Sequence, residues 1–167
     1  MSSSAPVAFL RTVTLFKEFA EADLAALSRQ LREHRLKKGE VLFREGEEGH
    51  EMFLIRSGAI VISKPITGRV EQVLARMGSG EFFGEMSLFD QYPRSATVQA
   101  EAESALLGLD RQHLERLVDM NPRAAAAFFR ALVEVFIQRL RESGNLIAEV
   151  TRWGLEATGL DVESQNR

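Results

Sequence analysis

The chain has 167 residues, of which 45% are hydrophobic and 27% charged, enough for one globular domain with a hydrophobic core. A net charge of −3 excludes a generally basic surface for nucleic acid or anionic lipid, so any anion site must be local. The absence of cysteine excludes disulfides, zinc–thiolate sites and cysteine-bound iron–sulfur clusters. No stretch is apolar enough to span a membrane and the N-terminus lacks signal-peptide features, so we expect a cytoplasmic protein.

The N-terminal segment predicts a short tail and one helix. Residues 1–14 are expected to form a loose tail. Further along, Leu24, Leu27 and Leu31 follow helical spacing. We therefore expect a helix from about Glu21 to His34.

The central segment, from about residue 36 to 109, changes to short apolar bursts. Examples are EVLFRE, EMFLIR, AIVIS and SALLGL, and glycine-containing turns such as EGEEG and GSGE stand between them. Six or more short strands at this spacing are typical of a small barrel or sandwich rather than of alternating strands and helices.

Helical spacing returns in the C-terminal segment. Asp110 suits an N-cap position, and the Asn-Pro pair at 121 and 122 ends this helix while opening another. The second helix is expected to run from Pro122 to about Trp153. The two C-terminal helices then occupy about 110–153, and residues 154–167 form a C-terminal tail.

The expected long helix carries an apolar seam with alternating spacings of four and three residues, the pattern of a heptad repeat. A helix of about 30 residues is ~45 Å long and outreaches a small domain. We therefore expect a parallel homodimer through this seam; the alternative is that the whole helix packs on the barrel. The seam consists of Phe129, Val133, Phe136, Leu140, Ser143, Ile147 and Val150, with Ser143 as its one polar member.

One short segment, GEFFGEMSLFDQYPRSATV, combines Gly84, Glu85 and Arg94. The glycine lets the backbone approach a ligand, and the turn after it opens a short helix whose N–H groups favour an anion. The planar guanidinium of Arg94 suits a phosphate, while Glu85 could accept hydrogen bonds from sugar hydroxyls. Phosphate and ribose together indicate a nucleotide. The alternative is a salt bridge between Glu85 and Arg94 across a loop.

Phe83–Leu88, followed after five residues by Arg94–Val98, resembles the phosphate-binding cassette of the cyclic nucleotide-binding domain family. Lys37–Ser63 also resembles the early strands of that family. The resemblance implies a mainly β fold with flanking helices: an eight-stranded β-roll (a double-stranded β-helix or jelly-roll), an N-terminal helix, a short cassette helix and two C-terminal helices. We expect this domain to occupy residues 15–153.

The resemblance implies a 3',5'-cyclic nucleotide as the ligand and no cofactor or metal. Arg94 would contact the cyclic phosphate, Glu85 the ribose 2'-hydroxyl, and nearby backbone N–H groups would complete the phosphate cradle. Ser95, the hydroxyl residue after the arginine, is compatible with either cAMP or cGMP. We expect cAMP, because a stand-alone sensor of bacterial type most resembles cAMP receptors. The expected ligand-binding residues are Gly84, Glu85, Met86, Ser87, Arg94, Ser95, Ala96 and Ser143.

Ser143 enters this set because the catabolite activator relatives contact adenine with polar residues of their long helix. Arg139 and Asn145 are weaker candidates for the same role. The alternative is a serine that only sets the helix register. Trp153 could either stack on the bound base or be buried against the dimer helix or the tail.

Residues 154–167 are too few for a helix-turn-helix module. We therefore expect no direct DNA binding and no catalysis, with the signal passed to an unidentified downstream protein. Two alternatives remain: a domain of the same fold that has lost its ligand and only dimerises, or a cupin-type metal enzyme. The three histidines, His34, His50 and His113, lie in different segments, which does not favour a metal site.

Overall fold

The computed structural model describes residues 4–67 and 70–157. Its contacts divide the chain into two units, which meet between Phe128 and Phe129. Within the described residues, no helix is both long and apolar enough to cross a membrane.

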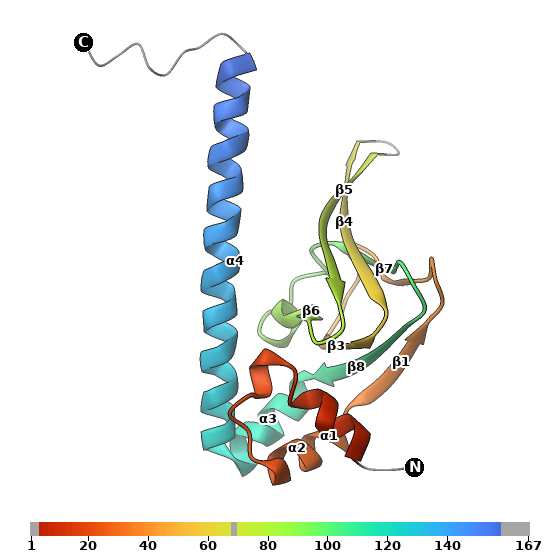
Figure 1. Ribbon diagram of the computed structural model, residues 1–167, viewed down its shortest axis with the longest axis vertical. Coiled ribbons are helices and arrows are strands. Elements are labelled where there is room, and N and C mark those ends of the chain that lie inside the picture. Colours follow the sequence, from red (N-terminus) through yellow and green to blue (C-terminus); the bar gives the residue numbers. More distant parts are fainter. Residues whose placement is uncertain (1–3, 68–69, 158–167) are drawn as a thin grey trace, which may run out of the picture. The chain divides into compact units, whose positions relative to one another are not determined.

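The first unit is a β-roll. Its described residues form eight strands in two four-stranded sheets, in the orders β1-β8-β3-β6 and β2-β7-β4-β5, and every pairing is antiparallel (Figure 1). This confirms the mainly β fold with eight strands and flanking helices. The strands are β1 (Arg32–Leu36), β2 (Val41–Phe43), β3 (Glu51–Ser57), β4 (Ala59–Thr67), β5 (Val70–Gly78), β6 (Phe82–Phe83), β7 (Thr97–Ala100) and β8 (Ser104–Asp110).

Strand β3 shows why this sequence forms a closed core. Phe53 and Ile55 belong to the main core cluster, where the Phe53 ring stacks on Phe83 with centroids 5.5 Å apart. Successive strand residues point to opposite faces. Met52 and Leu54 therefore lie on the other face, and they too are fully buried. Because both faces of the strand are buried, its sequence is a continuous apolar run.

The N-terminus differs from the loose tail expected for residues 1–14. Helix α1 (Ser4–Leu10) forms there, followed by the 3-10 helix η1 (Thr14–Phe16). Leu10 and Val13 are fully buried. Burial of these apolar side chains stabilises the segment, so it is part of the fold.

The predicted helix from Glu21 to His34 is wrong at its C-terminal end. Helix α2 (Glu21–Ser28) is only eight residues long. The residues from Arg32 onward form β1, which pairs with β8 in the register Arg32 to Gly108 and Leu36 to Ser104. Pairing with a neighbouring strand overrides the local helical spacing, which rested on Leu31.

Two helices follow the β-roll, as predicted. Helix α3 (Arg111–Met120) is capped by Asp110, and α4 (Pro122–Ala157) follows Asn121. The Asn121 side chain accepts a hydrogen bond from Ala124 N at 3.1 Å and donates one to Asp23 at 2.7 Å, which ties the helix junction to α2. Helix α4 also includes residues 154–157, which we assigned to the tail; residues 158–167 lie outside the described part.

The second unit consists of the remainder of α4. Several apolar side chains of the predicted seam are exposed on this helix, among them Leu140 at 75% and Ile147 at 67%. Ser143 and Trp153 are exposed as well. An apolar row exposed along a helix suits pairing with a second helix, which stays a prediction.

Candidate ligand-binding site

Gly84 sets the shape of the cassette. It follows β6 with φ at 75°, in the left-handed region that glycine adopts at low cost, and it precedes the 3-10 helix η2 (Glu85–Leu88). A Cβ at this position would lie 2.9 Å from Arg94 Nη1 and 3.3 Å from the Glu51 carbonyl oxygen. Only glycine therefore allows the start of η2 to lie this close to Arg94.

Arg94 is held inside the fold and is only 7% exposed. Its Nη1 donates to Ser87 Oγ and to the Glu51 carbonyl oxygen, both at 2.9 Å. The guanidinium carbon lies 4.1 Å from the centroid of the Phe43 ring, within cation–π distance. The backbone is fixed too, because Arg94 N donates to Glu47 O at 2.7 Å.

The charge of Arg94 is only partly balanced by the nearby carboxylates Glu51 and Glu47. The nearby carboxylate of Glu51 forms its ion pairs with Arg32 and His34 instead. The Nε of Arg94 is buried and has no hydrogen-bond partner in the described part of the chain. Burial lowers the pKa of Arg94 because loss of water disfavours the charged form, and the charges of Glu51 and Glu47 partly oppose this shift. A buried cation whose charge is only partly balanced is a favourable partner for an anion.

The structure brings part of the predicted site together. Gly84, Ser87 and Arg94 are in mutual proximity. Glu85 opens η2 and is 6% exposed, and Ala96 is buried, whereas Met86 and Ser95 are exposed. Ser143 belongs to the other unit, so its contact with a ligand stays a prediction.

Two residues around Arg94 were not predicted from the sequence. Phe43 supplies the aromatic face, and Gly49 lies so near that an added Cβ would contact Arg94 Nε. Gly49 stood in a run that indicated only a turn. Both residues come from a distant segment, and no local pattern links them to Arg94.

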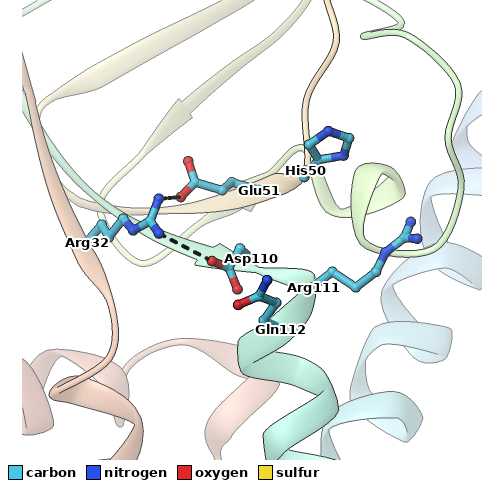
Figure 2. Close-up of a pocket in the computed structure, with 6 residues that line it drawn as sticks. All are labelled: Arg32, His50, Glu51, Asp110, Arg111 and Gln112. Carbon is cyan, nitrogen blue, oxygen red and sulfur yellow. Dashed lines mark hydrogen bonds and ion pairs between the residues drawn. The ribbon is translucent and has the colours of Figure 1, made fainter.

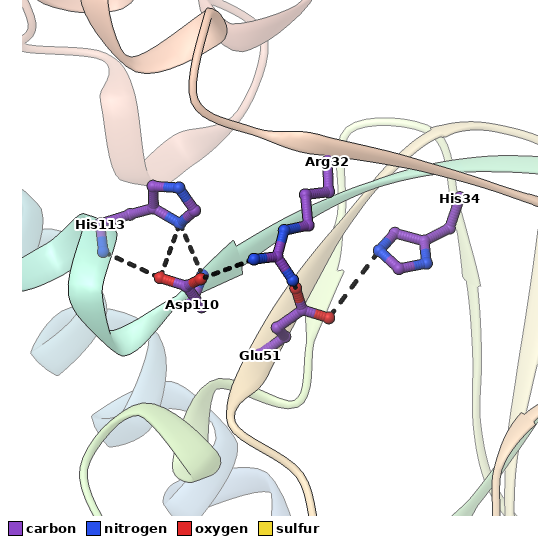
Figure 3. A network of polar contacts seen from close by, with 5 residues as sticks. All are labelled: Arg32, His34, Glu51, Asp110 and His113. Carbon is purple, nitrogen blue, oxygen red and sulfur yellow. Dashed lines mark hydrogen bonds and ion pairs between the residues drawn. The ribbon is translucent and has the colours of Figure 1, made fainter.

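A polar network lies where β1, β3 and β8 meet the start of α3 (Figure 3). Arg32 lies 3.5 Å from Glu51 and 3.8 Å from Asp110, and His34 Nε2 lies 3.8 Å from Glu51. Asp110 also contacts His113 Nδ1 at 2.8 Å. Groups of at least three histidine or acidic side chains that could hold a metal ion are absent from the described residues.

A pocket of about 460 Å³ opens beside this network (Figure 2). Charges of both signs line it, so it has no single electrostatic preference. The lining residues are Arg32, His50, Glu51, Asp110, Arg111 and Gln112. Arg111 connects this pocket to the cassette, because its guanidinium donates hydrogen bonds to Leu88 O at 3.0 Å and to Asp90 O at 2.7 Å.

Comparison with known proteins agrees with this geometry. The family model described as the cyclic nucleotide-binding domain matches residues 33–121. The chain belongs to this family. That range includes the cassette, all of the strands except the first residue of β1, and helix α3.

Individual relatives match most of the chain. A CRP-like cAMP-activated global transcriptional regulator of Mycobacterium tuberculosis is 29% identical over 81% of this chain, which spans 59% of that regulator's length. The N-terminal domain of a transcriptional regulator from Streptomyces coelicolor is 32% identical with a TM-score of 0.70, covering 83% of this chain and 94% of that domain. A cyclic nucleotide-binding domain from Methylobacillus flagellatus is 26% identical with a TM-score of 0.76, covering 88% and 83% of the two chains.

Proposed function

We propose that this chain is a regulatory module that binds a 3',5'-cyclic nucleotide, with cAMP preferred to cGMP. The observation that carries the proposal is the buried guanidinium of Arg94, whose Nε has no hydrogen-bond partner among the described residues. A phosphate would supply the missing negative charge and could accept a hydrogen bond from the unsatisfied Nε. Membership of the family supports the same ligand class.

Each part of the nucleotide has a proposed partner. Arg94 and the backbone N–H groups near Gly84, Ser87 and Ser95 would bind the cyclic phosphate. Glu85 would accept a hydrogen bond from the ribose 2'-hydroxyl, and Ser143 would contact the base. The role of the module would be binding and not catalysis.

The preference for cAMP is supported by the relatives. The Mycobacterium tuberculosis regulator is described as cAMP-activated, and a 31% identical relative is a cAMP-dependent protein kinase regulatory subunit from Mycosarcoma maydis. We also propose a homodimer formed through Phe129, Val133, Phe136, Leu140, Ile147 and Val150. The cytoplasmic location and the downstream protein partner stay predictions.

Calorimetric titration with cAMP and cGMP, with 5'-AMP as the non-cyclic control, tests the proposal. Arg94→Ala should weaken cAMP binding by ~2 to 5 kcal/mol, or about 30- to several-thousand-fold, because a desolvated phosphate is left unpaired. Glu85→Ala should weaken it less, since a hydroxyl can be partly rehydrated. Arg123→Ala is the matched control, because it removes the same charge from an exposed position.

The outcomes separate the alternatives. Equal affinity of wild type and Arg94→Ala would place the site elsewhere. No heat with either cyclic nucleotide, from a folded wild-type protein, would favour the ligand-free dimerising module.

A further inference from the structure

Arg111 is held rigidly at its backbone, because it occupies the first position of α3 directly after the N-cap. The Asp110 side chain accepts from His113 N at 2.9 Å, and the His113 ring accepts from Asp110 N at 3.2 Å. This reciprocal pair is a capping box and fixes the first turn of the helix. The side chain of Arg111 therefore extends from a well-anchored point.

The guanidinium of Arg111 binds the far end of the cassette helix. Nε donates to the carbonyl of Leu88, the last residue of η2, and Nη2 donates to the carbonyl of Asp90. In Figure 2 the side chain extends away from Arg32, on the other side of the pocket. The Leu88 carbonyl, at the end of the helix, carries partial negative charge, so a cation there is favourable, and Asp90 lies two residues beyond the helix.

The charge of Arg111 is directed to these carbonyl groups. No described carboxylate forms an ion pair with it. Hydrogen bonds from a charged donor are stronger than neutral ones, and two of them from one planar group also fix its direction. The contact therefore acts as a two-point clamp between η2 and α3.

The cassette helix is thus held at both ends. At its start, Gly84 lies against Arg94, and Ser87 accepts a hydrogen bond from Arg94. At its end, Leu88 is bonded to Arg111. Any movement of η2 at the Arg94 end changes the position of the two carbonyl groups that the first residue of α3 holds.

We infer that Arg111 is a positioning residue that couples the cassette to α3. The inference rests on the proposed function, because the movement to be transmitted is the one that we expect nucleotide binding to cause in η2. With the clamp intact, α3 follows the cassette. Without it, the cassette loses its hydrogen bonds to Arg111 and α3 no longer responds to the ligand.

The test compares wild type with Arg111→Gln, Arg111→Lys and Arg116→Gln. Arg116 is an exposed arginine on the same helix and serves as the matched control. Three quantities are measured: amide exchange of Phe89, Asp90 and Arg94 without ligand, cAMP affinity by calorimetry, and the cAMP-dependent change in exchange of residues 111–120.

Arg111→Gln should raise exchange of the cassette amides several-fold, weaken cAMP binding about 3- to 30-fold and abolish the ligand-dependent change in α3. Arg111→Lys keeps the charge but not the planar fork, so it should restore part of each effect. Arg116→Gln should match wild type. The partial recovery in Arg111→Lys distinguishes loss of the contact between Arg111 and the cassette from a general loss of helix stability.

Two results would overturn the inference in distinguishable ways. If wild type responds to cAMP and Arg111→Gln responds equally, Arg111 has no coupling role although the proposed function stands. If wild type shows neither heat nor an exchange change with cAMP or cGMP, the proposed function fails and the coupling fails with it. Should Arg111→Gln not fold, Arg111→Lys must show the intermediate values, or the inference is wrong.

Discussion

At the scale of single residues, the conformation of Arg94 depends on a glycine from another segment. Gly49 lies against the guanidinium, and a Cβ there would contact Nε and Cζ. The φ of Gly49 is outside the left-handed region, so alanine could adopt the same backbone. Glycine at position 49 therefore makes room for the Arg94 guanidinium and is not required by the backbone conformation of the turn.

Gly49→Ala should weaken cAMP binding and also lower the free energy of unfolding. The added methyl group would overlap the end of the Arg94 side chain, which must then shift and lose its hydrogen bonds to Ser87 and the Glu51 carbonyl. Gly78→Ala is the matched control, because a Cβ there meets nothing within 4 Å. Calorimetry and urea denaturation of both variants measure the two effects. In the Arg94→Ala background, Gly49→Ala should have no further effect on affinity, and a full additional loss would contradict this explanation.

Part of the candidate site could be grouped from the sequence. Gly84, Glu85, Ser87 and Arg94 lie within eleven residues, so spacing and residue type were enough to group them. Phe43, Gly49 and the Glu51 carbonyl were missed. Their contact with Arg94 exists only after β2 and β3 have been folded against the cassette, and a backbone carbonyl leaves no signal in the residue type.

At the scale of elements, the start of α3 is a junction. Asp110 ends β8, caps α3 and lies 3.8 Å from Arg32 of β1. The ion pair with Arg32 contributes little, because the arginine is 66% exposed and water screens the charges. The cap is therefore the main stabilising contribution of this side chain.

Asp110→Ala should lower the free energy of unfolding by about 0.5 to 2 kcal/mol, the usual cost of losing an N-cap. Asp119→Ala, an exposed change on the same helix, is the control and should stay near wild type. Denaturant unfolding followed by circular dichroism measures both. If the two variants are equally stable, the hydrogen bond from His113 N to the Asp110 side chain contributes nothing measurable.

The predictions of helices and strands are wrong where pairing with a distant strand determines the local structure. A small barrel or sandwich, α3 and most of α4 were expected from apolar periodicity and from Asp110 and Pro122, and the resemblance to the family implied the eight-stranded β-roll. The residues at 32–34 were expected in a helix because Leu24, Leu27 and Leu31 are helically spaced, yet they pair with β8. Local spacing carries no information on an available strand edge, so this boundary could not be predicted.

At the scale of the whole molecule, the exposed apolar row on α4 predicts a homodimer. Phe136→Glu together with Leu140→Glu would place unpaired charges in the seam and should yield monomers. Gln138→Glu with Arg141→Glu, at exposed positions outside the seam, is the control and should remain dimeric. Light scattering at tens of micromolar measures the mass. A monomeric wild type, with and without cAMP, would show that this row does not pair with a second copy.

The other prediction at this scale is that nucleotide binding changes the second half of α4. A ligand acts as a switch only if it binds one of two arrangements more tightly. Arg94 belongs to the first unit and Ser143 to the second, so a nucleotide that contacts both residues would favour the arrangement in which it can do so. The segment from Arg139 to Trp153 would then become more ordered and present a changed surface to a partner protein.

Hydrogen exchange of residues 139–153 measures this effect. Saturating cAMP should slow exchange in the segment for wild type, because ordering lowers the population of open states. Arg94→Ala at the same cAMP concentration should show no change, since its site would be unoccupied. Ser143→Ala should retain binding through the phosphate but lose part of the protection. Unchanged protection in a wild-type protein that binds cAMP would mean that the chain holds the nucleotide without transmitting its binding to α4.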